Sequence, residues 1–127
     1  MMKRILVVSL VFLFSSFSFQ NELDKNLLCQ KWHLKNYEAF WMDFEPEPNE
    51  MNDYLHLKPD FTYESVDEGI KEQGKWKMSE SENCFELFDE KGESLKFEVK
   101  ELNIKHLEVV ADVDELIDVS IHFYTKN

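Results

Sequence analysis

Residues 107–123 read LEVVADVDELIDVSIHF, in which apolar residues recur at every second position on both sides of an acidic pair. The apolar positions are Leu107, Val109, Ala111 and Val113, and then Ile117, Val119, Ile121 and Phe123. Because successive side chains of a β-strand point to opposite faces, this pattern predicts two strands with one apolar face. Asp114-Glu115 is the predicted turn between them, so the two strands pair antiparallel.

The same alternation recurs upstream of this pair. Strands are predicted from Lys31, over 54–58, from Phe61, from Gly74, over 84–89 and over 95–99. Turn residues separate several of these runs: Pro59-Asp60, Asp67-Glu68-Gly69 and Glu90-Lys91-Gly92-Glu93. Only Leu23 to Cys29 indicates a helix, a short one that Asn21 could cap.

Eight short strands without a long crossover helix indicate antiparallel neighbours. Closing such a sheet removes both of its edges. The sequence therefore predicts an all-β fold, an eight-stranded antiparallel up-and-down barrel. A two-sheet β-sandwich is the alternative.

The first twenty residues have the layout of a signal peptide. Lys3 and Arg4 precede the ten-residue apolar run 5–14, and small residues at Ser16 and Ser18 favour cleavage after Ser18. We therefore assign 1–20 to the export signal and 21–127 to one barrel domain, and expect a periplasmic or extracellular protein. An uncleaved anchor is the alternative, although the apolar stretch is short for a membrane-spanning helix.

Without Lys3 and Arg4, the chain keeps 12 lysines and 26 acidic residues, a net charge of −14, and it has no arginine. Such a chain repels phosphate backbones and anionic membranes, which argues against nucleic-acid binding and against membrane association after cleavage. An acidic surface remains available to a protein partner. Cys29 and Cys84 allow either a disulfide or two free buried thiols in an exported protein.

The connection between the first two predicted strands is unusual. Residues 37–44 are rich in aromatic side chains and lead into the acidic stretch 45–53. In an up-and-down barrel this loop lies at a mouth, where ligands enter. Phe40, Trp41 and Phe44 are therefore candidates for an aromatic lid over a ligand. The alternative is that they extend the first strand and pack on its neighbours.

The predicted interior contains six large rings. They are Trp32, Phe61, Tyr63, Trp76, Phe97 and Phe123. Eight strands enclose an interior that side chains fill, or that holds one small ligand. We therefore expect a small cavity that is apolar apart from Tyr63, with Tyr63 and Trp76 as ligand-binding candidates.

No pattern in the chain indicates catalysis. No nucleophile motif, zinc-protease motif or phosphate-binding glycine loop is present, so we expect no enzyme, cofactor or metal. By parity all four histidines point outward. If Val113 pairs with Ile117, His106 and His122 become diagonal neighbours on adjacent strands.

Several segments together resemble the bacterial exported lipocalin-like domain family. They are Leu28-Cys29-Gln30-Lys31-Trp32-His33-Leu34, Tyr54-Leu55-His56-Leu57, Pro59-Asp60-Phe61-Thr62-Tyr63 and Gly74-Lys75-Trp76, with the closing alternations. The Gly-x-Trp of true lipocalins reads Gln30-Lys31-Trp32 here. The resemblance implies a ligand-binding barrel. Our functional hypothesis is an exported, non-enzymatic barrel that binds a small apolar ligand. The alternative is a protein-interaction or inhibitor barrel with a filled interior and an acidic surface.

Overall fold

The computed structural model describes residues 23–114 and 117–126. The predicted signal peptide over 1–20, its cleavage site and the predicted cap Asn21 lie outside the described residues. Within this part of the chain, no helix has the length and apolar character needed to cross a membrane.

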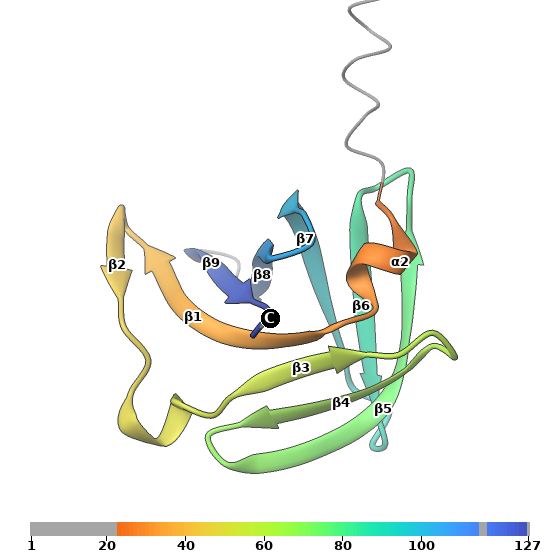
Figure 1. Cartoon of the computed structure of the whole chain (residues 1–127), viewed down its shortest axis with the longest axis horizontal. Coiled ribbons are helices and arrows are strands. Elements are labelled where there is room, and N and C mark those ends of the chain that lie inside the picture. The colour runs from red at the N-terminus through yellow and green to blue at the C-terminus, as the bar shows by residue number, and fades with distance from the viewer. Residues whose placement is uncertain (1–22, 115–116, 127) are drawn as a thin grey trace, which may run out of the picture.

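Strands make up nearly all the regular structure of the described residues (Figure 1). The elements are α2 (Lys25–Leu28), β1 (Lys31–Ala39), β2 (Met42–Phe44), the 3-10 turn η2 (Pro48–Glu50), β3 (Tyr54–Leu57), β4 (Thr62–Asp67), β5 (Ile70–Ser79), β6 (Cys84–Asp89), β7 (Ser94–Leu102), β8 (His106–Asp114) and β9 (Ile117–Tyr124). The helix is shorter than predicted, and Asp24 caps it by accepting a hydrogen bond from the Asn26 amide at 2.8 Å.

The sheet is a closed barrel. Strands β3 to β9 pair antiparallel in sequence order, β1 pairs with β3, and β1 also pairs with β9 to close the sheet. The predicted eight-stranded antiparallel up-and-down barrel is therefore confirmed. One strand was not predicted: β2 forms a hairpin with the last three residues of β1 and is a ninth strand outside the ring.

The register of the last two strands agrees with the prediction over most of their length. His106 faces Tyr124, Glu108 faces His122 and Ala111 faces Val119. The predicted Val113–Ile117 pair is wrong, because a register shift after Ala111 places Asp114 opposite Ile117. A bulge of this kind inserts one extra residue and leaves the rest of the ladder unchanged.

The barrel has one closed end and one open end. At the closed end lie α2 and the β3–β4, β5–β6 and β7–β8 connections. At the open end lie the β1–β3, β4–β5 and β6–β7 connections. Leu28 of α2 is fully buried, and its carbonyl accepts a hydrogen bond from the Trp32 indole N–H at 2.9 Å. The helix therefore covers the closed end.

Large rings gather in the closed half of the interior. Trp32 and Trp76 are buried, and the Trp76 indole N–H donates to the Lys58 carbonyl at 3.0 Å. Phe85 is also buried, and its ring stacks on that of Phe97 with centroids 5.1 Å apart. The prediction that Trp32 and Trp76 lie in the barrel interior is therefore confirmed, and both lie near the closed end.

Phe61 corrects the predicted interior. It does not begin a strand but lies in the β3–β4 turn at φ 64°, with 40% of its surface exposed. Its ring packs on the outer side of the Trp76 ring, with centroids 5.0 Å apart, and the Lys25 ammonium lies 3.9 Å from its centroid. Phe61 therefore covers the closed end from outside instead of filling the barrel.

Both cysteines are free thiols. Cys84 is buried on β6, and Cys29 is half-buried after α2. Burial raises the pKa of each thiol. Of the two possibilities that the sequence left open, the structure has the unpaired one.

Trp32→Ala should lower the free energy of unfolding by about 3–5 kcal/mol, because it removes a fully buried ring and leaves a cavity. Urea unfolding followed by circular dichroism measures this change. Trp41→Ala is the matched control, since that ring is 97% exposed and its loss should change the unfolding free energy little. Equal effects of the two substitutions would contradict the assigned core.

Candidate functional site

A cavity of about 480 Å³ occupies the open half of the barrel. Its apolar wall is formed by buried side chains from seven strands: Leu34, Leu55, Tyr63, Leu87, Phe97, Ala111 and Phe123. Pockets of about 300–1,000 Å³ with mostly apolar walls are typical of small-molecule sites. The cavity is therefore larger than the sequence suggested, because the largest rings lie at the other end.

Gly74 shapes one wall of this cavity. It lies opposite Tyr63 on β4 and opposite Asp89 on β6. A Cβ atom at this position would lie 2.1 Å from the Phe88 carbonyl oxygen and 2.8 Å from Cε1 of Tyr63. Only glycine therefore lets the Tyr63 ring lie against the β5 backbone, which positions the ring in the cavity wall.

The rim of the cavity is acidic. Asp53 belongs to the acidic stretch 45–53 that was predicted at a mouth of the barrel, whereas the other carboxylates of the rim were not predicted. Five carboxylates contribute to the described lining: Asp53, Asp67, Glu72, Asp89 and Glu93. All five lie at or beside strand ends, next to connections at the open end. Because every second connection of an up-and-down barrel lies at the same end, this topology brings together carboxylates that are far apart in the sequence. The alternation of connections between the two ends of the barrel is the sequence signal that could have revealed these carboxylates.

Asp53 is the most buried of these carboxylates, with 7% of its surface exposed. Its Oδ1 atom accepts a hydrogen bond from the Glu68 amide at 3.0 Å, in the β4–β5 turn. Burial raises the pKa of this carboxyl group, and the negative charges of Asp67 and Glu50 raise it further, against the lowering effect of the backbone hydrogen bond.

Glu50, Asp53 and Asp67 form the one group of three potential metal ligands found among the described side chains. One ligand oxygen from each lies within 4.8 Å of the other two. Carboxylate oxygens are suitable ligands for Ca²⁺. Glu50 also accepts a hydrogen bond from the Tyr37 hydroxyl at 2.6 Å, which fastens the loop before β3 to β1. The group therefore has a structural role that needs no ion.

The predicted ligand-binding residues are divided among three places. Tyr63 lines the cavity, as expected. Trp76 is buried at the closed end, outside the lining. Phe40, Trp41 and Phe44 belong to the β1–β2 hairpin and are also outside the lining.

The β1–β2 hairpin combines features of both sequence interpretations. β1 extends beyond its buried positions and into the hairpin, which agrees with the interpretation that this segment lengthens the first strand. The aromatic side chains nevertheless remain exposed, which agrees with the interpretation that they do not pack on the neighbouring strands. Phe40 and Trp41 form the two-residue turn with φ angles of 54° and 60°. Such angles are unfavourable for bulky side chains and are normally adopted by Asn and Gly in turns of this type.

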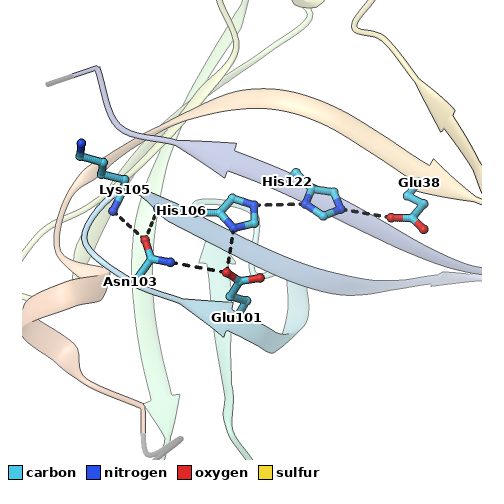
Figure 2. Close-up of polar contacts among 6 residues, drawn as sticks. All are labelled: Glu38, Glu101, Asn103, Lys105, His106 and His122. Atoms are coloured by element: carbon cyan, nitrogen blue, oxygen red, sulfur yellow. Dashed lines mark hydrogen bonds and ion pairs between the residues drawn. The ribbon is translucent and has the colours of Figure 1, made fainter.

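A second polar cluster lies on the outer wall, where the sequence placed the histidines. The His106 and His122 rings are 11° from parallel, and His106 Nε2 lies 3.1 Å from His122 Nδ1. Figure 2 shows the contact continuing to a carboxylate at each end: His106 Nδ1 is 3.4 Å from Glu101, and His122 Nε2 is 3.3 Å from Glu38. The predicted proximity of the two rings is confirmed.

This cluster joins four strands. Glu101 belongs to β7, His106 to β8, His122 to β9 and Glu38 to β1, so the chain of contacts crosses the seam that closes the barrel. His106 contacts Glu101 through Nδ1 and His122 through Nε2, and His122 contacts Glu38 through its own Nε2. Every ring nitrogen thus has a partner, and the arrangement is a structural link between strands.

Comparison by sequence gives no relative: no family profile matches the chain, and no curated protein matches it at a significant level. Comparison by structure finds a DUF4847 family protein from Bacteroides vulgatus ATCC 8482, with a TM-score of 0.53 and 12% identity. The match covers 80% of this chain and 96% of that protein. At this identity the likeness concerns the β-barrel fold alone.

Asp53→Asn should increase stability at neutral pH. Because the native pKa of Asp53 is raised, its contribution to stability is present at low pH and is lost as pH rises through that pKa. An amide can still accept the Glu68 hydrogen bond without carrying the charge. The advantage of the variant should therefore be small at pH 4 and larger at pH 7.5, measured by urea unfolding. Asp43→Asn, at an exposed position on β2, controls for the loss of one charge; the same pH trend there would contradict the assignment.

Proposed function

We propose that this chain is an exported, non-enzymatic binding protein that holds one small ligand with an apolar body in the open-end cavity. The observation that carries the proposal is the cavity itself, about 480 Å³ with a buried apolar wall. Export and the absence of catalysis rest on the sequence patterns described above. The resemblance to lipocalin-like domains supports a binding role.

The wall of the cavity exposes apolar surface that a ligand could cover. Side chains such as Leu55, Leu87 and Phe97 face a space that no other side chain fills. An apolar ligand in this space would remove from water both its own surface and the surface of these side chains. The burial contributes about 25 cal/mol of binding free energy per Å², before the costs of association are subtracted. The barrel frame is closed by backbone hydrogen bonds, so little ordering cost is expected on binding.

Filling the cavity should abolish binding. Ala111 is 1% exposed, lines the cavity and faces Phe97 across the β7–β8 ladder. Ala111→Phe should therefore occupy the ligand's space and weaken binding of the neutral fluorescent probe N-phenyl-1-naphthylamine by about tenfold or more, equivalent to about 1.4 kcal/mol. Fluorescence titration measures the affinity.

The matched control is the adjacent residue on the opposite face. Val110 does not line the cavity, and Val110→Phe adds the same ring outside the barrel. It should leave probe affinity unchanged. Equal affinity of both variants, or no binding of the probe to the unaltered protein, would contradict the proposed function.

The second candidate function is protein interaction through the tip of the β1–β2 hairpin. Phe40, Trp41 and Met42 are 64%, 97% and 60% exposed, so their apolar surface stabilises the barrel little. Two of them adopt positive φ, which costs of order 1–3 kcal/mol each. Strained and exposed aromatic residues favour a role in contact with a partner, and the acidic Asp43 and Glu45 beside them suit a basic partner surface.

The double variant Phe40→Asn with Trp41→Gly tests whether the aromatic side chains of the hairpin tip contribute to the stability of the barrel. The Asn-Gly pair is preferred in this turn, so the double variant should be more stable by about 1–2 kcal/mol. Its affinity for the naphthyl probe should be unchanged. Met42→Ala, an adjacent exposed position, should change stability little. A loss of stability in the double variant would show that the aromatic tip maintains the barrel, against the interaction hypothesis.

A further inference from the structure

We propose that the ligand carries an organic ammonium group beside its apolar body, and that the carboxylates at the open end select this positive charge. The inference rests on the proposed function, because it names the class of ligand that the same cavity would take. It is carried by the composition of the rim together with an unpaired hydroxyl group in the cavity wall.

The charges around the cavity have one sign. Five carboxylates contribute to the described lining, and no lysine or histidine is part of it. The lysines nearest to the carboxylates have other positions: Lys71 pairs with Glu64 on the outer face, and Lys91 lies exposed at the β6–β7 turn. Most other lysines lie toward the closed end. The acidic rim is therefore a local arrangement as well as a consequence of the net charge.

Tyr63 supplies the second observation. The residue is 4% exposed and lines the cavity. Its hydroxyl oxygen makes no hydrogen bond to the described residues and is not among the fully buried unpaired atoms, so it opens onto accessible space. Water or a ligand can therefore satisfy this polar group. A phenolic oxygen can accept a hydrogen bond from an ammonium N–H. The hydroxyl thus provides a neutral acceptor inside a carboxylate-rimmed cavity.

Neighbouring carboxylates add to the raised pKa values of two tyrosines at the cavity. Burial raises the pKa of Tyr63, and the charges of Glu72 and Asp89 raise it further. The pKa of Tyr37 is also raised, first by burial and then by its hydrogen bond to Glu50. In each case neighbouring carboxylates disfavour an additional negative charge.

The carboxylates at the rim also determine which amphiphile can enter. A carboxylate headgroup at the rim would be repelled by several like charges, whereas an ammonium group would be attracted to them and would retain partial hydration. Two ligands with identical apolar bodies can therefore differ in affinity, because the rim attracts a positive headgroup and repels a negative one. A fatty acid is therefore disfavoured, and an alkylammonium ion is favoured.

Three probes with the same ten-carbon chain test the proposal: decylammonium, decan-1-ol and decanoate. Each is titrated against the naphthyl probe at pH 7.5 and low salt. Decylammonium should bind about tenfold or more tightly than decanoate, with decan-1-ol between them. Added salt should reduce this difference, because it screens partly exposed charges.

Two variants of equal charge distinguish the effect of the rim carboxylates on binding from the effect of the chain's net charge. Glu72→Gln with Glu93→Gln removes two rim carboxylates. Glu80→Gln with Glu98→Gln removes two exposed carboxylates that do not line the cavity. The rim variant should lose most of the preference for decylammonium over decan-1-ol and keep its affinity for the alcohol. The control variant should keep the preference.

The outcomes distinguish the two proposals. If decan-1-ol or decanoate binds as tightly as decylammonium, or if both variants lose the preference equally, selection by the rim is overturned and the cavity remains a binding site. If none of the three displaces the probe, and the probe itself does not bind, the proposed function is overturned as well.

Discussion

Strand β1 pairs with three other strands, and the division of its hydrogen bonds among them shapes the barrel. Its first residues, Lys31 to His33, pair with β3, while its last residues, Tyr37 to Ala39, pair with β2 instead. Along its other edge β1 pairs with β9 from His33 to Glu38, which closes the ring. The strand therefore leaves β3 partway along its length, and its curvature is visible in Figure 1. Where the pairing with β3 ends, the Leu34 amide donates a hydrogen bond to the carbonyl of Asp53, which lies just before β3.

The cavity follows from an uneven distribution of side-chain volume. Trp32, Trp76 and Phe85 fill the half of the barrel that α2 covers, and the residues facing the other half include Ala111, Ser65 and Ser94. An eight-stranded barrel has room for little more than its own side chains. A space of about 480 Å³ remains in the other half, where Tyr63, Phe97 and Phe123 line the wall of the cavity.

Periodicity predicted the barrel, its strand order and most of the β8–β9 register, because each depends on local alternation and short turns. It did not predict features that depend on backbone detail. Phe61 continues the apolar pattern of β4 but adopts a positive φ and leaves the interior, and a bulge displaces the Val113–Ile117 pair. For the site, parity identified Tyr63, and the acidic stretch 45–53 placed Asp53 at a mouth. The other rim carboxylates could be found only by asking which strand ends meet.

A concentration of carboxylates at one end has an energetic consequence that links the site to the fold. Burial raises the pKa of Asp53 and of Tyr63, and the like charges of neighbouring carboxylates raise both pKa values further in the ligand-free barrel. A cation at the rim would relieve this repulsion only in the folded state, where the carboxylates are brought together. Binding of the proposed ligand would therefore stabilise the barrel by mass action, by about 2.7 kcal/mol at a free concentration one hundred times the dissociation constant. On this view the acidic rim lowers the stability of the ligand-free barrel and increases the stability that the barrel gains when a cation is bound.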